Sequence, residues 1–125
     1  MSERILLSDA HRTDEVRAQL AAFHPEVVAR VRAAVETDEV VVVGMAQNPF
    51  VRRARRALDA AGQPFTYLEF GSYLARWHER LAIKMWSGYP TYPQVFVRGV
   101  LIGGFRELSA RLDAGALFEG VAPRG

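Results

Sequence analysis

The chain has 125 residues, which suits one domain that can bury a core without disulfides or structural metals. Half of the residues are hydrophobic and the formal net charge is +2, so the bulk charge indicates no particular partner. There is no cysteine, which excludes disulfides, thiolate metal sites and cysteine nucleophiles.

The chain is expected to begin with an irregular segment over residues 1–12, followed by a first helix. Thr13 is a suitable N-cap, because its hydroxyl can accept a hydrogen bond from a free backbone N–H in the first turn. Val16, Leu20 and Phe23 then fall on one face at helical spacing.

A second helix is expected to begin at Pro25, since proline suits the first turn. Asp38 falls beyond the end of this helix. Its apolar stripe consists of Val27, Val28, Val31 and Val35. We therefore expect an N-terminal helical extension over residues 1–36, and a second unit over residues 37–125.

Val40–Val43 has the pattern of a strand buried on both faces. Asn48 and Pro49 form a strong helix start, and Gly62 marks the end of that helix. The apolar stripe of this helix consists of Val51, Ala54, Leu58 and Ala61. Phe65–Phe70 is the next strand. A strand–helix–strand unit with short loops predicts a parallel pair of strands.

A further helix is expected over Ser72–Trp86, and the segment Gly88–Pro93 breaks it. The apolar face of this helix consists of Leu74, Trp77, Leu81 and Met85. Trp77 and Trp86 fit a helix that packs on a sheet, so both are expected in the core.

Gln94–Val97 and Val100–Ile102 are expected to form a hairpin around the two-residue turn Arg98-Gly99. A last helix follows Gly103-Gly104, with Leu108, Leu112 and Leu117 as its apolar residues. The element order is two helices and then β-α-β-α-β-β-α. This order predicts an α/β fold in which helices flank a four-stranded mixed sheet.

The residues around the hairpin resemble the glutaredoxin signature, and are closest to its monothiol branch. The matching residues are Tyr89-Pro90-Thr91-Tyr92-Pro93-Gln94-Val95-Phe96-Val97, Gly99 and Gly103-Gly104. The resemblance covers about Val40 to Leu117 and implies a thioredoxin-like fold.

The resemblance also implies a glutathione site. Pro93 takes the place of the family's cis-proline, and the backbone of Tyr92 would pair with glutathione. Arg80 would meet a glutathione carboxylate. The residues that the resemblance assigns to glutathione are Arg80, Thr91, Tyr92, Pro93, Gly103, Gly104, Phe105 and Arg106. Two alternatives stay open: the proline turn only maintains the fold, and Arg80 is a solvated residue near Glu79.

The active-site motif of the family is degenerate in this chain. Asn48-Pro49-Phe50-Val51 replaces the motif Cys-Pro-Tyr-Cys or Cys-Gly-Phe-Ser, with Asn48 in the place of the nucleophile. An amide has no sulfur and cannot attack a disulfide. Instead, Asn48 can cap the helix at a gain of roughly 1 kcal/mol. Met45 replaces the usual lysine before the motif, and Arg106 replaces the usual aspartate after the glycine pair.

These features predict a non-catalytic glutaredoxin homologue that binds glutathione or a protein partner in redox or iron–sulfur-related processes. An iron–sulfur cluster is not expected, because the thiolate ligand is missing. An alternative is a glutathione-dependent transferase or oxidoreductase that uses a non-cysteine residue, for which Ser72, Tyr73 and Tyr89 are candidates. A third hypothesis is that the N-terminal helices mediate assembly with another protein.

A basic run of four arginines lies on the helix after Asn48: Arg52, Arg53, Arg55 and Arg56. We interpret this run as a solvated face and expect no nucleic-acid partner, because no aromatic residues interleave with the arginines. His11, His24 and His78 lack metal-ligand spacing, so no metal site is expected. No signal-peptide pattern or long apolar run is present, and we expect a cytoplasmic protein without a membrane partner.

Overall fold

One mixed sheet of four strands forms the centre of the molecule, in the order β2-β1-β3-β4. The computed structural model describes residues 7–122. In chain order the elements are η1 (Asp9–His11), α1 (Asp14–Ala22), α2 (Pro25–Thr37), β1 (Val40–Gly44), α3 (Pro49–Ala60), β2 (Thr66–Glu69), α4 (Trp77–Ser87), β3 (Gln94–Val97), β4 (Val100–Gly103) and α5 (Phe105–Asp113). Within residues 7–122, no helix is long and apolar enough to span a bilayer.

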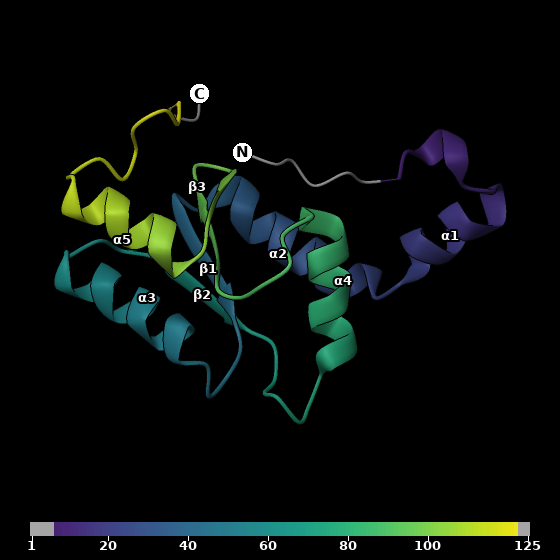
Figure 1. The fold of residues 1–125 in the computed structure, drawn as a ribbon, viewed down its shortest axis with the longest axis horizontal. Coiled ribbons are helices and arrows are strands. Elements are labelled where there is room, and N and C mark those ends of the chain that lie inside the picture. The colour runs from purple at the N-terminus through teal and green to yellow at the C-terminus, as the bar shows by residue number, and fades with distance from the viewer. Residues whose placement is uncertain (1–6, 123–125) are drawn as a thin grey trace.

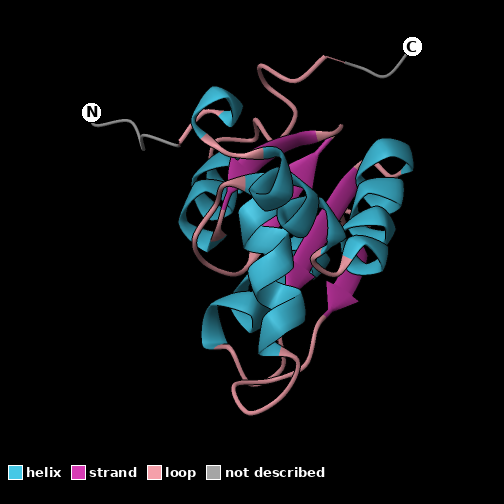
Figure 2. Ribbon diagram, turned by 90° about the vertical axis from the view of Figure 1, so that its right-hand side faces the viewer, coloured by secondary structure: helices cyan, strands magenta, loops and turns pink. Residues whose placement is uncertain are grey.

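The sheet separates two helical layers, and the predicted fold is confirmed. β1 runs parallel to β2 and antiparallel to β3, and β3 and β4 form a hairpin. Figures 1 and 2 show α2 and α4 against one face of the sheet, and α3 and α5 against the other. Because side chains alternate along a strand, β1 contributes Val41 and Val43 to one layer and Val40 and Val42 to the other.

The two N-terminal helices differ in how they join this core. In α2, Val27, Val31 and Val35 are buried in the same cluster as the inner residues of β1. In α1, by contrast, no residue is buried, and Figure 1 shows this helix extending away from the sheet beyond α4. The boundary expected between residues 36 and 37 falls near the end of α2. Residues 1–12 were expected to be irregular, but they include the short helix η1. Residues 1–6 of this segment lie outside the described residues.

The prediction for α4 was wrong in both its start and its buried face. The helix begins at Trp77, and residues 72–75 instead form a tight turn closed by two backbone hydrogen bonds. The predicted apolar stripe faces outward: the exposed fractions are 95% for Leu74, 55% for Trp77, 39% for Leu81 and 44% for Met85. Trp86 is also 37% exposed, so neither tryptophan is in the core.

The backbone explains the changed face of α4. Gly71 and Arg76 both have positive φ angles, +69° and +62°, so the chain turns twice before the helix begins. After these turns, Arg80, Ala82 and Ile83 are the α4 residues that are buried. Spacing alone identified an apolar stripe but not the side of the helix that meets the sheet.

Other local predictions agree with the structure, with two exceptions. Thr13 caps α1, since its hydroxyl oxygen accepts the N–H of Val16 at 3.2 Å. The hairpin turn has positive φ at both Arg98 and Gly99, which is the geometry of a two-residue type I′ turn.

Ala61, which was expected on the apolar stripe of α3, is instead the exposed C-cap of that helix. Leu117 was expected on the last helix but follows the end of α5 at Asp113.

Candidate functional site

Asn48 occupies the N-terminus of α3 as a helix cap, as predicted. Its side-chain oxygen accepts the backbone N–H of Phe50 at 2.9 Å and that of Val51 at 3.1 Å. Pro49 follows at the first helical position and has no N–H to satisfy. Asn48 is only 9% exposed. Its oxygen is therefore used to satisfy the helix end, in the position where the resemblance implies a reactive sulfur.

A groove of about 980 Å³ connects Asn48 with the proline turn and the start of α5. Its lining residues come from the loop between β1 and α3, the start of α3, the loop between β2 and α4, α4 itself, the loop before β3, and the segment that begins α5. They are Met45, Asn48, Phe50, Tyr73, Lys84, Tyr89, Pro90, Thr91, Tyr92, Pro93, Gly104, Phe105, Arg106, Glu107, Ser109, Ala110 and Asp113. Most of the residues that the resemblance assigns to the site are thus brought together.

Tyr92 joins the groove to the core behind it. The Tyr92–Pro93 peptide bond is cis, and the Tyr92 side chain is buried. The phenol donates a hydrogen bond to the carbonyl oxygen of Arg80 at 2.6 Å, and burial raises the pKa of this hydroxyl above its ordinary value. Lys84 Nζ lies 5.5 Å from the centre of the Tyr92 ring. The ring is therefore a fixed part of the wall and does not act as an acid or base near neutral pH.

Arg80 does not line the groove, and the interpretation of this residue as solvated was wrong. It is only 7% exposed. Its guanidinium donates to the carbonyl oxygens of Phe70 at 2.9 Å and Ala75 at 2.6 Å, while the neighbouring Glu79 pairs with Arg76 instead. Arg80 therefore anchors the loop between β2 and α4. Lys84, one helical turn later, is the cation of α4 that borders the groove.

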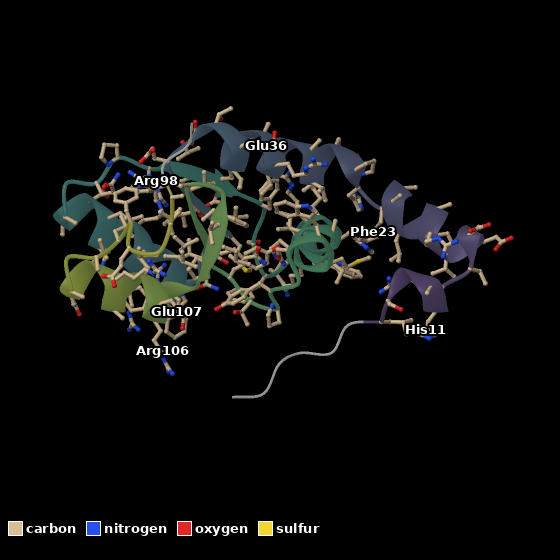
Figure 3. The ribbon with its side chains drawn as sticks, turned by 90° about the horizontal axis from the view of Figure 1, so that it is seen from above. His11, Phe23, Glu36, Arg98, Arg106 and Glu107 are labelled. Carbon is tan, nitrogen blue, oxygen red and sulfur yellow. The ribbon has the colours of Figure 1, made fainter. Side chains whose placement is uncertain are left out.

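The start of α5 already holds a carboxylate of its own. Glu107 Oε1 accepts the N–H of Gly104 at 2.8 Å and the hydroxyl of Tyr89 at 3.3 Å. The bond from Gly104 is the main cause that lowers the pKa of Glu107 below 4.5. The resemblance implied that this glycine pair lets the backbone amides of Phe105 and Arg106 approach a ligand carboxylate. In the structure, Glu107 accepts the amide of Gly104 just before them, and the Arg106 side chain points outward from the helix (Figure 3).

Gly103 lies behind this contact and does not border the groove. Its φ angle is +126°, and an added Cβ would lie 2.5 Å from Glu107 Oε1. The glycine is therefore needed for the strand to approach the Glu107 carboxylate. Pro49 and Val51 of the degenerate motif also lie outside the lining, and Val51 is 1% exposed in the core.

Several lining residues were missed by the sequence reasoning. Glu107 follows Gly104 by three residues, and this spacing is the signal of a capping box. Lys84 is the only lysine of the chain. Of the hydroxyl candidates for an alternative activity, Tyr73 and Tyr89 line the groove and Ser72 does not. The hydroxyl of Tyr89 is already donated to Glu107.

The run of arginines on α3 is exposed, as expected for a solvated face, and two of the four also pack against aromatic rings. The guanidinium of Arg53 lies 5.3 Å from the centre of the Phe50 ring, and that of Arg55 lies 4.0 Å from the centre of the Tyr67 ring. Phe50 is 50% exposed at the groove. The basic face of α3 thus reaches the rim of the groove through Arg53 and Phe50.

The donor set does not fit an iron–sulfur cluster. The chain supplies no thiolate, and the oxygen of Asn48 is committed to two backbone N–H groups. Within residues 7–122, no group of three or more His, Cys, Asp or Glu side chains is placed to hold a metal ion. The rings of His24 and His78 lie 6.2 Å apart, and neither histidine borders the groove.

Comparison with known proteins identifies the family. The glutaredoxin family model matches residues 40–102. A "Glutaredoxin-like protein" of Dictyostelium discoideum is 44% identical over 107 residues, which is 86% of this chain and 87% of that protein. The crystal structure of a wheat glutaredoxin superposes with a TM-score of 0.64 at 26% identity, over 75% of this chain and 87% of that one. A buckwheat glutaredoxin–glutathione complex gives a TM-score of 0.65 at 23% identity, over 85% and 90%. The chain therefore belongs to the glutaredoxin family, as a member without cysteine.

Proposed function

We propose that this protein binds reduced glutathione without reacting with it, in the groove between Asn48, Tyr92 and Gly104. The observation that carries the proposal is that the capped N-terminus of α3 and the Tyr92–Pro93 turn border one groove. Both sides of the groove that the resemblance implies therefore lie together, and Asn48 stands in the place of the sulfur. The existence of a glutathione complex for a buckwheat relative of the same fold supports this choice of ligand.

The chemistry at Asn48 makes the interaction reversible. Disulfide exchange needs a thiolate that attacks sulfur, and an amide offers neither the charge nor the sulfur. A thiol that enters the groove meets the edge of a side chain whose oxygen is already hydrogen-bonded to Phe50 and Val51. No mixed disulfide forms, so the residence time of the ligand depends on non-covalent contacts alone.

The charges of the groove favour weak binding. Lys84 and Arg106 bring positive charge, and Glu107 and Asp113 bring negative charge, so the charged lining is balanced. Glutathione has two carboxylates and one ammonium group near neutral pH. With a balanced lining, little net attraction is available, and we expect a dissociation constant on the order of 1 mM, about −4 kcal/mol.

Titration calorimetry and NMR with reduced glutathione test the binding. S-methylglutathione serves as the matched ligand, and it is expected to bind equally well because no sulfur chemistry contributes. Lys84→Gln should weaken binding several-fold. Arg52→Gln, which removes a cation from the exposed face of α3 outside the groove, should leave binding unchanged. Absence of both heat and chemical-shift changes at millimolar glutathione would reject the ligand and leave a protein partner for the groove.

A disulfide-reduction assay tests the proposed lack of reactivity. The wild-type protein with glutathione and glutathione reductase should give no turnover of a model disulfide above the background without protein. Measurable turnover by the cysteine-free chain would refute the non-catalytic assignment even if glutathione binds.

A further inference from the structure

Two exposed aromatic side chains line the groove together with Asn48. Phe50 is 50% exposed and Tyr73 is 60% exposed. The first ring comes from the first turn of α3, and the second comes from the loop between β2 and α4. Within residues 7–122 the Tyr73 hydroxyl makes no hydrogen bond. Neither ring is therefore buried in the core, and we call this pair the aromatic rim.

Backbone contacts hold the two segments of the aromatic rim beside Asn48. The N–H of Ala46 donates to the carbonyl oxygen of Gly71 at 2.7 Å, which joins the loop before Asn48 to the loop that carries Tyr73. The N–H of Phe50 donates to the Asn48 side-chain oxygen at 2.9 Å. The aromatic rim is therefore next to the residue that stands in the place of the sulfur.

The charges of the groove come from other segments. Met45, which precedes Asn48 by three residues, adds a flexible apolar side chain to the lining. Among the described lining residues, the charged ones all belong to α4 or α5: Lys84, Arg106, Glu107 and Asp113. The segments around Asn48 thus supply apolar surface, while α4 and α5 supply the charges that a peptide ligand needs.

Reduced glutathione would leave the aromatic rim exposed to water. Its side chain ends at the sulfur, so it carries no apolar group that reaches beyond Asn48. The groove volume of about 980 Å³ is near the upper end of the roughly 300–1,000 Å³ that is usual for small-molecule sites. Removal of apolar surface from water is favourable in proportion to its area. An apolar group on the sulfur would therefore add affinity by covering Phe50 and Tyr73.

We propose that the preferred ligands of this groove are glutathione thioethers, in which an apolar group on the sulfur covers the aromatic rim. The inference rests on the proposed function, because the tripeptide has to lie in the groove with its sulfur toward Asn48. A thioether has neither a thiol proton nor a disulfide bond, so no exchange takes place in the complex. The protein thus holds the ligand unchanged, after a reaction that joins an apolar electrophile to the glutathione sulfur.

Calorimetry with three ligands that differ only at the sulfur tests the inference. S-hexylglutathione should bind about tenfold or more tightly than S-methylglutathione, whose methyl group is too short to cover the rim. Reduced glutathione should bind like the methyl compound. A hexyl compound that binds no more tightly than the methyl compound would overturn the inference and leave the proposed function standing. If none of the three binds at millimolar concentration, the proposed function fails and the inference fails with it.

S-hexylcysteine tests whether the tripeptide takes part in this binding. It carries the same apolar chain without the γ-glutamyl and glycyl residues, so it lacks the groups that α4 and α5 would contact. It should bind about tenfold more weakly than S-hexylglutathione, or not at all. Equal affinities for the two compounds would mean that the hexyl chain adsorbs by itself, and would contradict a glutathione thioether as the ligand.

Substitution of the two rings tests where the hexyl chain lies. Phe50→Ala and Tyr73→Ala should each lower the ratio of the hexyl to the methyl affinity about threefold, and the double variant should bring it close to one. Val100→Ala is the matched control with an unchanged ratio, because Val100 is 49% exposed on β4 and does not line the groove. Circular dichroism establishes that each variant is folded. A wild-type ratio in the double variant would place the chain elsewhere and refute the proposal.

Discussion

Two helix N-termini border the groove at Asn48, and they satisfy their free backbone N–H groups in opposite ways. At α3, a neutral amide from Asn48 accepts two N–H groups. At α5, the Glu107 carboxylate accepts the N–H of Gly104. A helix N-terminus carries a partial positive charge, which a neutral cap leaves in place and a carboxylate offsets. An anionic group in the groove is therefore attracted more strongly to the start of α3 than to the start of α5.

Asn48→Cys gives the largest expected change, because it restores a sulfur at the α3 end. The partial positive charge there favours a thiolate, so the thiol pKa should fall below its ordinary value of about 8.5. The variant should form a mixed disulfide with oxidised glutathione, which mass spectrometry detects as an added glutathionyl group. Asn48→Ser, a cap without sulfur, is the control. An introduced thiol with an ordinary pKa would show that α3 does not activate this position.

Gly103→Ala tests the α5 end by removing the space for Glu107. The alanine would be strained at a φ of +126° and its Cβ would collide with Glu107 Oε1. We expect a loss of about 1–3 kcal/mol in the free energy of unfolding, measured by urea denaturation. The same substitution in a Glu107→Ala background keeps the backbone strain and removes the side chain that the Cβ meets, so it separates the strain from the collision. Equal losses in the two backgrounds would contradict a specific role of the Glu107 contact.

Asn48→Ala tests the cap at α3 alone. Removing the amide leaves the N–H groups of Phe50 and Val51 without their side-chain partner. The free energy of unfolding should fall by about 1 kcal/mol. Asn48→Asp keeps the cap and adds a charge that suits a helix start, so it should be at least as stable as the wild type. Thermal and urea unfolding of the three proteins should give a stability that decreases from Asp to Asn to Ala at position 48. An alanine variant as stable as the wild type would show that the cap contributes nothing.

Glu107→Gln gives the smallest effect and separates charge from capping at α5. The amide can still accept the Gly104 N–H, while the negative charge is removed, so affinity for glutathione should rise a few-fold in calorimetry. The variant also has a pH signature. Since the folded-state pKa of Glu107 is lowered below 4.5, its carboxylate stabilises the fold above that pH, and the stabilisation is lost as the pH falls through the folded-state value. The melting temperature should therefore decrease less in Glu107→Gln than in wild type when the pH is lowered from neutral toward about 3.

The fold was predictable from sequence where local chemistry decides the structure. The start of α3 needs a capping side chain and tolerates proline, and the hairpin turn needs positive φ angles. Few residues suit these positions, and the predictions for Asn48-Pro49 and Arg98-Gly99 are both confirmed. The valines of β1 alternate between two helical layers, which is what a strand buried on both faces requires. Such features need only neighbouring residues, so a single sequence contains enough information for them.

The errors concern contacts between distant parts of the chain. Arg80 is buried by carbonyl groups of a loop that precedes α4, and nothing in its own neighbourhood indicated this. The outward stripe of α4 has the same spacing as a buried stripe, because periodicity identifies a face without identifying the partner that covers it. In the groove, family resemblance located Tyr92 and Gly104 but gave no warning that Glu107 already occupies the amide of Gly104.

The two carbonyls held by Arg80 impose a constraint on how this protein can vary. The Arg80 guanidinium donates hydrogen bonds to the carbonyl oxygens of Phe70 and Ala75. The backbone carbonyl oxygen of Arg80 in turn accepts the hydrogen bond of the Tyr92 hydroxyl. The number of residues between Phe70 and Ala75 therefore affects the position of Arg80, and through it the position of Tyr92. An insertion or deletion between Phe70 and Ala75 would displace the wall of the groove, so homologues that keep the groove should conserve the length of this loop even where its residues differ.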